Sequence, residues 1–223
     1  MERPVDHRGL NAPTVPGGRA KRTVDVIGAF LLLLITLPIM LATLLAIRTV
    51  MGKPVLFRQQ RPGLGGAPFT LLKFRTMSEP DVGEAAVSDD ERLPGLGRFL
   101  RRWSLDELPE LINVLRGDMS LVGPRPLLME YLPLYTPEQA RRHEARPGLT
   151  GLAQVEGRNA LSWEERFALD VWYVDHRSLR LDLGILARTV GLVLSGRAVS
   201  HAGHATMPPF RGTRDGAKED ADA

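Results

Sequence analysis

The sequence predicts an α+β fold that is mostly helical, with an N-terminal membrane helix ahead of one folded domain. A long uncharged apolar segment, Val26–Ile47, predicts the membrane helix. Two short β-prone segments joined by a glycine-rich turn predict a small β-hairpin. In the remainder, apolar residues recur at the spacing typical of amphipathic helices. A chain of 223 residues has room for one domain with a sizeable core and hardly for two.

Composition sets the limits of the folded domain. Residues 1–20 are rich in Pro, Gly and Arg and predict a disordered basic arm, and residues 207–223 predict a disordered tail. This leaves 21–52 for the membrane helix and 53–206 for the domain. Cysteine is absent, which excludes a disulfide framework, a thiolate metal site and a cysteine nucleophile. The net charge is only +3, but the basic residues cluster locally.

The membrane segment allows two interpretations. Val26–Ile47 is long enough to cross the bilayer as a plain spanning anchor. However, Pro38 lies near its middle and should bend the helix, and the hydroxyl of Thr36 is available to a freed carbonyl. Both flanks are also basic, whereas a spanning helix usually shows a charge asymmetry. The basic flanking residues are Arg19, Lys21, Arg22, Arg48, Lys53, Arg58 and Arg61. These features favour a re-entrant helix that enters one leaflet, breaks at Pro38 and returns to the same face.

The predicted hairpin follows the membrane helix. Residues 55–58 and 69–74 are the expected strands, and the turn between them contains Arg61-Pro62-Gly63-Leu64-Gly65-Gly66. No Gly-Lys-Ser/Thr follows these glycines, which excludes a Walker A phosphate loop. Residues 78–95 are acidic and contain Gly and Pro, so we expect a surface loop there.

The rest of the domain is predicted to be helical, with two rigid loops. The candidate helices are 94–102, 106–116, 126–133, 136–144, 162–175 and 181–195. The loops 117–126 and 146–159 present Arg125 and Arg158, respectively, among glycines and prolines, and Asn159 is a further candidate beside Arg158. An arginine on a stiff loop can face a phosphate. For either arginine alone, a solvated surface position explains the pattern equally well.

An acid pair, Asp106 and Glu107, stands at the expected start of the helix 106–116. Ser104 and Glu107 have the spacing of a capping box. Asp106 is the alternative cap. A helix capped by Asp106 has Pro109 in its first turn, where proline is tolerated, whereas a helix capped by Ser104 has Pro109 beyond the first turn, where proline disturbs it. With either cap, the first turn of the helix favours a carboxylate and any phosphate brought to it. Together with the preceding Arg101 and Arg102 and the apolar segment, the pair predicts carboxylate chemistry on an anionic substrate at a membrane surface. The alternative for Asp106 is a merely structural cap.

Several segments, in their order along the chain, resemble motifs of the bacterial sugar transferase family, the monotopic phosphoglycosyl transferases of glycoconjugate assembly. They are Lys21–Asp25, Phe57–Gly63, Leu72–Met77, Leu105–Pro109, Gly117–Ser120, Gly123–Pro126 and Arg146–Gly151. The resemblance extends from about Lys21 to His204 and is more specific than any single motif. The short chain resembles the minimal members rather than the long forms with extra spanning helices.

The resemblance implies a reaction and a set of site residues. The family transfers a sugar-1-phosphate from a UDP-sugar to a polyprenyl phosphate such as undecaprenyl phosphate, releases UMP, and uses an Asp-Glu pair with Mg²⁺. The aspartate becomes covalently bound to the phosphosugar. Asp106 and Glu107 occupy the positions of that pair, as catalytic residues and metal ligands. The expected substrate-binding residues are Lys73, Arg101, Arg125, Arg158 and Asn159.

The resemblance also implies a location. It places interfacial amphipathic helices around one cytoplasmic catalytic domain at the bacterial inner membrane. The family's re-entrant helix is broken at a Ser-Pro, whereas this chain has Leu37-Pro38 with Thr36 one place earlier. The expected partners are a UDP-sugar, a polyprenyl phosphate and the lipid of one leaflet, without nucleic acid; the oligomeric state and the sugar stay open.

Two other functions remain as alternatives. A membrane-anchored, metal-dependent phosphodiester hydrolase would use the same carboxylates but release a free sugar phosphate. A non-catalytic membrane adaptor would use Asp106 only as a helix cap. The basic residues at the expected pocket argue against the adaptor, because a scaffold has no need of them.

Overall fold

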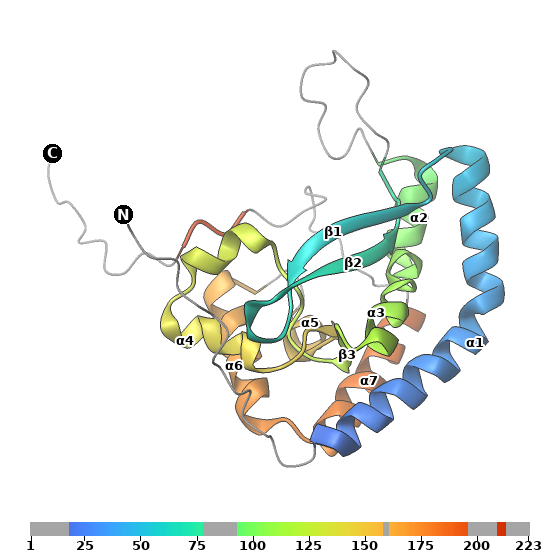
Figure 1. Cartoon of the computed structure of the whole chain (residues 1–223). Helices are drawn as coiled ribbons and strands as arrows, with labels where there is room; N and C mark the ends of the chain where they lie inside the picture. Colours follow the sequence, from blue (N-terminus) through green and yellow to red (C-terminus); the bar gives the residue numbers. More distant parts are fainter. Residues whose placement is uncertain (1–17, 78–92, 158–160, 196–208, 213–223) are drawn as a thin grey trace, which may run out of the picture.

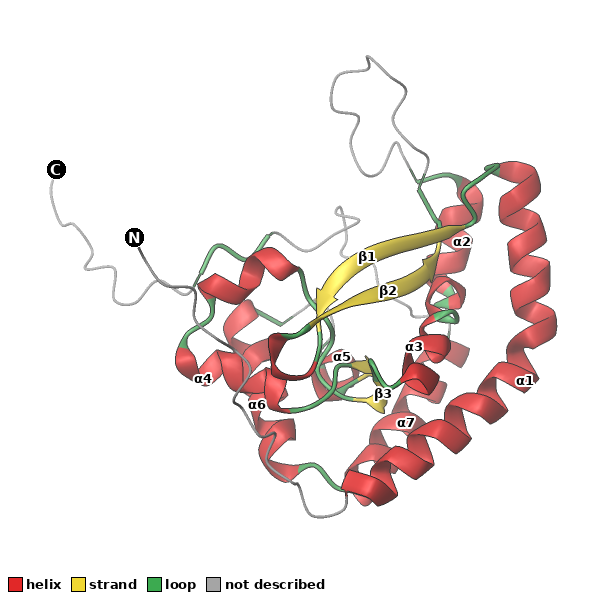
Figure 2. Ribbon diagram, in the orientation of Figure 1, coloured by secondary structure: helices red, strands yellow, loops and turns green. Residues whose placement is uncertain are grey.

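The computed structural model describes residues 18–77, 93–157, 161–195 and 209–212. The first elements are α1 (Gly18–Val50), β1 (Leu56–Pro62), the 3-10 turn η1 (Leu64–Gly66), β2 (Pro68–Phe74), α2 (Gly95–Arg102), η2 (Leu105–Glu107) and α3 (Glu110–Arg116). They are followed by β3 (Ser120–Val122), η3 (Met129–Leu134), α4 (Pro137–Ala140), η4 (Arg141–Glu144), β4 (Gly148–Thr150), α5 (Leu152–Glu156), α6 (Trp163–His176) and α7 (Leu179–Leu194). Figure 2 shows helices around two small sheets, which confirms the α+β, mostly helical prediction.

Helix α1 begins three residues before the predicted membrane helix, so residues 18–20 belong to it and not to the expected arm. In the part of the chain that the structure describes, α1 is the one helix long and apolar enough to cross a membrane. It runs through Pro38 without interruption, and Figure 1 shows it bent along one side of the molecule. The predicted break is therefore a bend, as expected where a proline removes one helical hydrogen bond.

The expected role of Thr36 is wrong. Pro38 lacks the N–H that would bond the carbonyl of Leu34, but the Thr36 hydroxyl donates to the carbonyl of Leu32, at 2.7 Å. A hydroxyl in a helix reaches a carbonyl three or four residues before it, so position 36 cannot reach residue 34.

The N-terminal end of α1 is bound to the folded domain by polar side chains. The buried carboxylate of Asp25 accepts hydrogen bonds from the Ser120 hydroxyl (2.8 Å) and the Leu121 N–H (3.1 Å). Arg22 donates to two carbonyls at the C-terminal end of α3, and Lys21 pairs with Asp182 of α7 at 2.7 Å. These contacts attach the start of α1 to α3, β3 and α7.

The C-terminal end of α1 is bound to the same domain. Ile47 is fully buried in a cluster with Phe74 and Leu100. The guanidinium of Arg75, directly after β2, donates to backbone carbonyls of residues 51–53, where α1 ends. A cation at a helix C-terminus also interacts favourably with the helix dipole. The two ends of α1 are thus fixed to one body.

The predicted hairpin is confirmed, with longer strands. β1 and β2 pair antiparallel from Leu56 opposite Phe74 to Pro62 opposite Pro68. The fully buried Asn113 of α3 joins the helix to β2, because its side chain accepts from the Leu72 N–H and donates to the Thr70 carbonyl.

A second sheet was missed by the sequence analysis. β3 and β4 pair in parallel and lie within the two segments predicted as rigid loops, and α5 follows β4. Each strand has three residues, too short to show an alternating pattern. Gly123 and Gly148 let the two segments approach closely, since a Cβ at Gly123 would lie 2.2 Å from the Arg146 carbonyl oxygen.

The predicted helices differ in outcome. Those at 94–102, 162–175 and 181–195 are confirmed as α2, α6 and α7, with ends within two residues of the prediction. Those at 126–133 and 136–144 are instead short 3-10 and α turns, η3, α4 and η4. Pro133 lies inside η3 and removes a donor that a continuous helix needs. Pro137 stands at the first position of α4, where a missing N–H costs the helix nothing.

The C-terminal segment contradicts the expected disordered tail at one place. Phe210 is buried in a hydrophobic cluster with Tyr131, Phe167 and Leu127, and its N–H donates to the Tyr131 hydroxyl at 3.2 Å. A single aromatic residue among Pro, Gly and charges gives no core-forming pattern, so the sequence did not reveal this contact.

We predict that Asp25→Ala destabilises the protein in detergent. The substitution leaves the buried Leu121 N–H without its partner, which costs about 1–3 kcal/mol. At about 2–4 °C per kcal/mol, the melting temperature should fall by several degrees. Thr23→Ala is the matched control, because the exposed Thr23 hydroxyl bonds only to Arg19 of the same helix in the described structure. Equal melting temperatures for the two variants would contradict the anchoring role of Asp25.

Candidate functional site

The acid pair lies in η2, a 3-10 turn between α2 and α3. Ser104, directly before η2, has a left-handed backbone conformation, with φ 52° and ψ 25°. This conformation is uncommon for a non-glycine residue. Pro109 stands at the N-cap of α3, where its missing N–H removes nothing that the helix needs. The predicted helix over 106–116 is therefore a 3-10 turn followed by a shorter helix.

Neither cap predicted from the sequence is formed. Ser104 makes no side-chain capping bond, and α3 has no side-chain cap at its N-terminus. The capping box and the Asp106 cap are both wrong, because Pro109 delays the start of the helix by several residues. The two carboxylates are consequently not used as caps.

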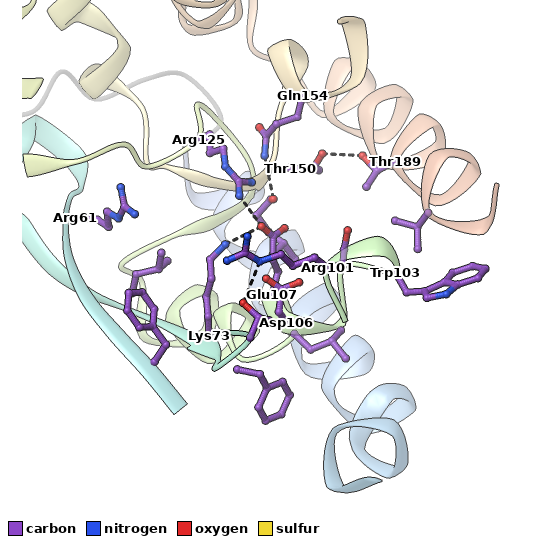
Figure 3. A pocket seen from close by; sticks show the side chains of 18 of the residues that line it. Arg61, Lys73, Arg101, Trp103, Asp106, Glu107, Arg125, Thr150, Gln154 and Thr189 are labelled. Atoms are coloured by element: carbon purple, nitrogen blue, oxygen red, sulfur yellow. Dashed lines mark hydrogen bonds and ion pairs between the residues drawn. The ribbon is translucent and has the colours of Figure 1, made fainter. Parts of the chain in front are cut away.

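Glu107 is bound by two cations. Its Oε1 atom lies 2.7 Å from Lys73 Nζ and 2.6 Å from an Arg125 guanidinium nitrogen, as Figure 3 shows. Lys73 comes from β2 and Arg125 from the loop after β3. The hairpin, η2 and the loop thus meet at one carboxylate. Lys73 and Arg125, expected from the resemblance as substrate-binding residues, both contact Glu107 in this geometry.

The two cations determine the charge of Glu107. Burial alone raises the pKa of Glu107, but the positive charges of Arg125 and Lys73 and their hydrogen bonds lower it by more. The net pKa lies well below the ordinary glutamate value, so Glu107 is an anion at neutral pH. The same contact, chiefly with Glu107, raises the pKa of Arg125.

Asp106 is in a different environment. Its side chain is buried, and within the described residues its carboxylate makes no hydrogen bond or ion pair. Burial and then the charge of Glu107 raise the pKa of Asp106, against the opposing effect of Lys73, Arg101 and Arg125. Adjacent carboxylates therefore differ: one is bound by cations, and the other is left available to a ligand.

Glu110 is a third acid that the sequence analysis missed. It is buried and lies 3.1 Å from Lys73, which bridges it to Glu107. Burial raises the pKa of Glu110 to about 7, although Lys73 acts in the opposite direction. Its position three residues after Glu107, which places it on the same face of a helical turn, was the signal available in the sequence.

The acid pair opens into a cavity of about 980 Å³. Its polar part is lined by Asp106, Glu107, Lys73, Arg101, Arg125, Arg61 and Arg166. Arg101 Nε donates to the Thr76 hydroxyl at 3.0 Å. Its apolar part is lined by residues of α1, β3 and α7 that include Leu32, Leu121, Leu186 and Val190. One cavity therefore combines a cationic surface with an apolar wall that includes α1 (Figure 3).

Two predicted residues cannot be placed, and two residues of the cavity were not predicted. Arg158 and Asn159 lie outside the described residues. Arg61 and Arg166 line the cavity but were not predicted, because the sequence placed them in a turn and in a helix without indicating the direction of their side chains.

The donor set of the acid pair fits Mg²⁺. Magnesium commonly uses one or two protein carboxylates together with substrate phosphate oxygens. Asp106 has no partner among the described residues. Lys73 and Arg125 both bind Oε1 of Glu107, which leaves Oε2 of Glu107 available to a metal ion. The described residues contain no group of three or more His, Asp or Glu side chains able to hold a metal. Phosphate oxygens would therefore have to complete the coordination.

Known proteins resemble this chain over most of its length. The family model described as bacterial sugar transferase matches residues 17–196. The uncharacterized sugar transferase EpsL of Bacillus subtilis is 55% identical over 196 residues, covering 87% of this chain and 97% of the relative. The UDP-glucose:undecaprenyl-phosphate glucose-1-phosphate transferase of Caulobacter vibrioides is 48% identical over 195 residues, covering 82% and 73%.

A third relative extends the same pattern. The exopolysaccharide production protein ExoY of Rhizobium meliloti is 39% identical over 199 residues, covering 81% of this chain and 88% of the relative. The matched region includes α1, the hairpin and the acid pair. The chain therefore belongs to the bacterial sugar transferase family.

Proposed function

We propose that this protein is a polyprenyl-phosphate sugar phosphotransferase, which moves a sugar-1-phosphate from a UDP-sugar to undecaprenyl phosphate and releases UMP. The observation that carries the proposal is the Asp106 carboxylate, which has no partner among the described residues, beside a Glu107 held by Lys73 and Arg125. The names of the Caulobacter relative and of the undecaprenyl-phosphate galactose phosphotransferase of Salmonella typhimurium support the same reaction.

The cationic side chains bind the donor. A UDP-sugar brings a diphosphate toward two carboxylates, and this approach is repulsive unless positive charge offsets it. Lys73, Arg101 and Arg125 supply that charge on one wall of the cavity. Asp106 and Glu107 would hold Mg²⁺ together with the diphosphate, and the bound ion would supply further positive charge.

In the first step, Asp106 acts as the nucleophile. A carboxylate oxygen of Asp106 attacks the phosphorus that carries the sugar, and the bond from this phosphorus to the bridging diphosphate oxygen breaks. The electron pair leaves with that oxygen, so UMP departs and an aspartyl phosphosugar remains. Arg125 and Lys73 stay on Glu107 and keep positive charge beside the reacting phosphoryl group.

In the second step, an oxygen of polyprenyl phosphate attacks the same phosphorus. The bond to Asp106 breaks, the carboxylate is regenerated, and the product is a polyprenyl diphosphate sugar. The apolar wall of the cavity, formed in part by α1 and α7, suits an acceptor with a hydrocarbon chain. A site next to the membrane helix brings a water-soluble donor and a lipid-bound acceptor together.

The attachment of α1 supports a re-entrant topology. A straight helix of 33 residues would extend about 50 Å, more than the roughly 30 Å of a hydrocarbon core. In a spanning helix, however, the two ends would lie on opposite sides of the membrane. Both ends of α1 bind one body, whereas most large apolar side chains between them are exposed. We therefore place the body, with α1 dipping into one leaflet, on the cytoplasmic face of the inner membrane.

The hydrolase and the adaptor, the two alternative functions, differ from a transferase in what they release. A hydrolase would release a free sugar phosphate from the donor, and an adaptor would release nothing. UMP release from UDP-glucose or UDP-galactose that depends on undecaprenyl phosphate distinguishes transfer from both.

We predict that Asp106→Asn abolishes transfer without unfolding the protein, because an amide is not a nucleophile toward phosphorus. The rate of UMP release should fall about 10³-fold or more, with an unchanged melting temperature. Asp175→Asn on the exposed end of α6 is the control and should stay active. Substantial transfer by folded Asp106→Asn would remove Asp106 from the mechanism.

We predict a covalent intermediate. Protein incubated with a competent UDP-sugar and without acceptor should gain the mass of a phosphosugar on the peptide that contains Asp106. Intact-mass measurement followed by peptide mapping tests this. The absence of an adduct, together with kinetics that require a ternary complex, would favour direct transfer instead.

We predict that both ends of α1 face the cytoplasm. The chain has no cysteine, so Ala20→Cys and Lys53→Cys each introduce a single thiol at an exposed position near one end of the helix. In intact cells, both should be protected from a membrane-impermeant thiol reagent, and both should react after lysis. Labelling of Ala20→Cys from outside would instead indicate a spanning helix.

A further inference from the structure

The loop that carries Arg125 is held from two sides. On one side, β4 and its flank bind the backbone: the Gly123 N–H donates to the Thr150 carbonyl at 2.9 Å, and the Gly148 N–H donates to the Pro124 carbonyl at 3.0 Å. On the other side, the carbonyl of Arg125 accepts a hydrogen bond from Arg142 at 2.8 Å. Pro124 and Pro126 fix their own φ angles and restrict the residues before them.

Arg142, which lies in η4, is among the largest fully buried side chains of the described structure. Its Nε and one terminal nitrogen donate to Asp170 Oδ2 of α6, at 3.0 and 2.6 Å. The guanidinium lies 5.8 Å from the Tyr135 ring centre and 5.5 Å from that of Phe167. The nitrogen that binds Asp170 at 2.6 Å is also the donor to the Arg125 carbonyl.

Stability alone is a poor explanation for this arrangement. Removing two charges from water is costly, and well-packed apolar residues often stabilise such a place as well as an ion pair does. A planar guanidinium, however, binds a carboxylate through two nitrogens and a carbonyl in a fixed direction, which a lysine ammonium does not. The arrangement therefore suits the placement of a backbone atom.

That backbone atom belongs to the residue that binds Glu107. Arg125 is held at both ends, by Arg142 at its carbonyl and by Glu107 at its guanidinium. We propose that Arg142, oriented by Asp170, is a positioning residue of the transfer reaction, which fixes the Arg125 backbone and so places the Arg125 guanidinium against Glu107 and the donor phosphates. The role as stated rests on the proposed function.

The test is a double-mutant cycle between positions 142 and 125, with transfer of radiolabelled sugar from UDP-glucose or UDP-galactose to undecaprenyl phosphate as the assay. Arg142→Lys keeps the positive charge but loses the planar guanidinium, whose nitrogens bind Asp170 and the Arg125 carbonyl. Because a small displacement of a catalytic group costs about 10- to 100-fold in rate, kcat/KM should fall by that factor. In an Arg125→Ala background, Arg142→Lys should change kcat/KM by less than about threefold, since its effect passes through Arg125.

Asp170→Asn provides a second, milder variant in case Arg142→Lys does not fold. The amide keeps an acceptor for the guanidinium but loses the charge that orients it. Its effect on kcat/KM should likewise be large in the wild-type background and nearly absent beside Arg125→Ala, whatever the change in melting temperature.

Arg141→Lys is the matched control. Arg141 is the neighbouring residue of η4 and also pairs with α6, through Asp175, but it makes no hydrogen bond or ion pair with the Arg125 loop within the described structure. Its variant should keep near wild-type activity in both backgrounds. It therefore measures any effect of simply loosening η4 from α6.

The outcomes separate the two proposals. Arg142→Lys and Asp170→Asn could instead lower kcat/KM by the same factor in the wild-type and Arg125→Ala backgrounds. That result would overturn the positioning role and leave a general effect on folding. Wild-type activity of Arg142→Lys would overturn it as well. Failure of the wild-type protein to transfer sugar from any UDP-sugar tested would instead count against the proposed function.

Discussion

The candidate site depends on one interaction, the binding of the Glu107 carboxylate by Lys73 and Arg125. It joins three parts of the chain that are distant in sequence: the hairpin, η2 and the loop after β3. Burial would otherwise favour the neutral acid, and the two cations reverse this preference. They keep a negative charge next to Asp106, whose own pKa is raised by burial and by that charge. Two adjacent carboxylates therefore acquire different properties from their different surroundings.

The position of the membrane helix follows from a second set of polar contacts. Asp25 and Arg22, near the beginning of α1, bind backbone groups of the domain. Arg75 of the domain binds backbone carbonyls of residues 51–53, directly after the end of α1. Such contacts are directional and fix orientation more closely than apolar packing does. They bring the bent α1 to the cavity, where Leu32 forms part of the wall. The same contacts thus determine both how α1 lies and what surrounds the candidate site.

The sequence predicted the parts of the fold that rest on local patterns. α2, α6 and α7 have clear apolar spacing, and the hairpin has two β-prone segments around a turn. The failures have local causes as well. Pro109 moved the start of α3, Pro133 interrupted an expected helix, and three-residue strands left β3 and β4 without a detectable alternation. Phe210 packs into a cluster assembled from distant residues, which no local pattern records.

By itself, the sequence determined the mostly helical fold class and the apolar helix, because residue type and spacing are local information. Its motifs also singled out Asp106, Glu107, Lys73, Arg101 and Arg125 as candidate site residues. Only the tertiary structure decided which carboxylate is paired and which has no partner within the described part of the chain. It also revealed Glu110 behind Lys73 and the contact from Arg142 to the backbone of Arg125. The reason is physical: the charge state and orientation of a side chain depend on burial and on neighbours within a few ångströms, and folding brings those neighbours from anywhere in the chain.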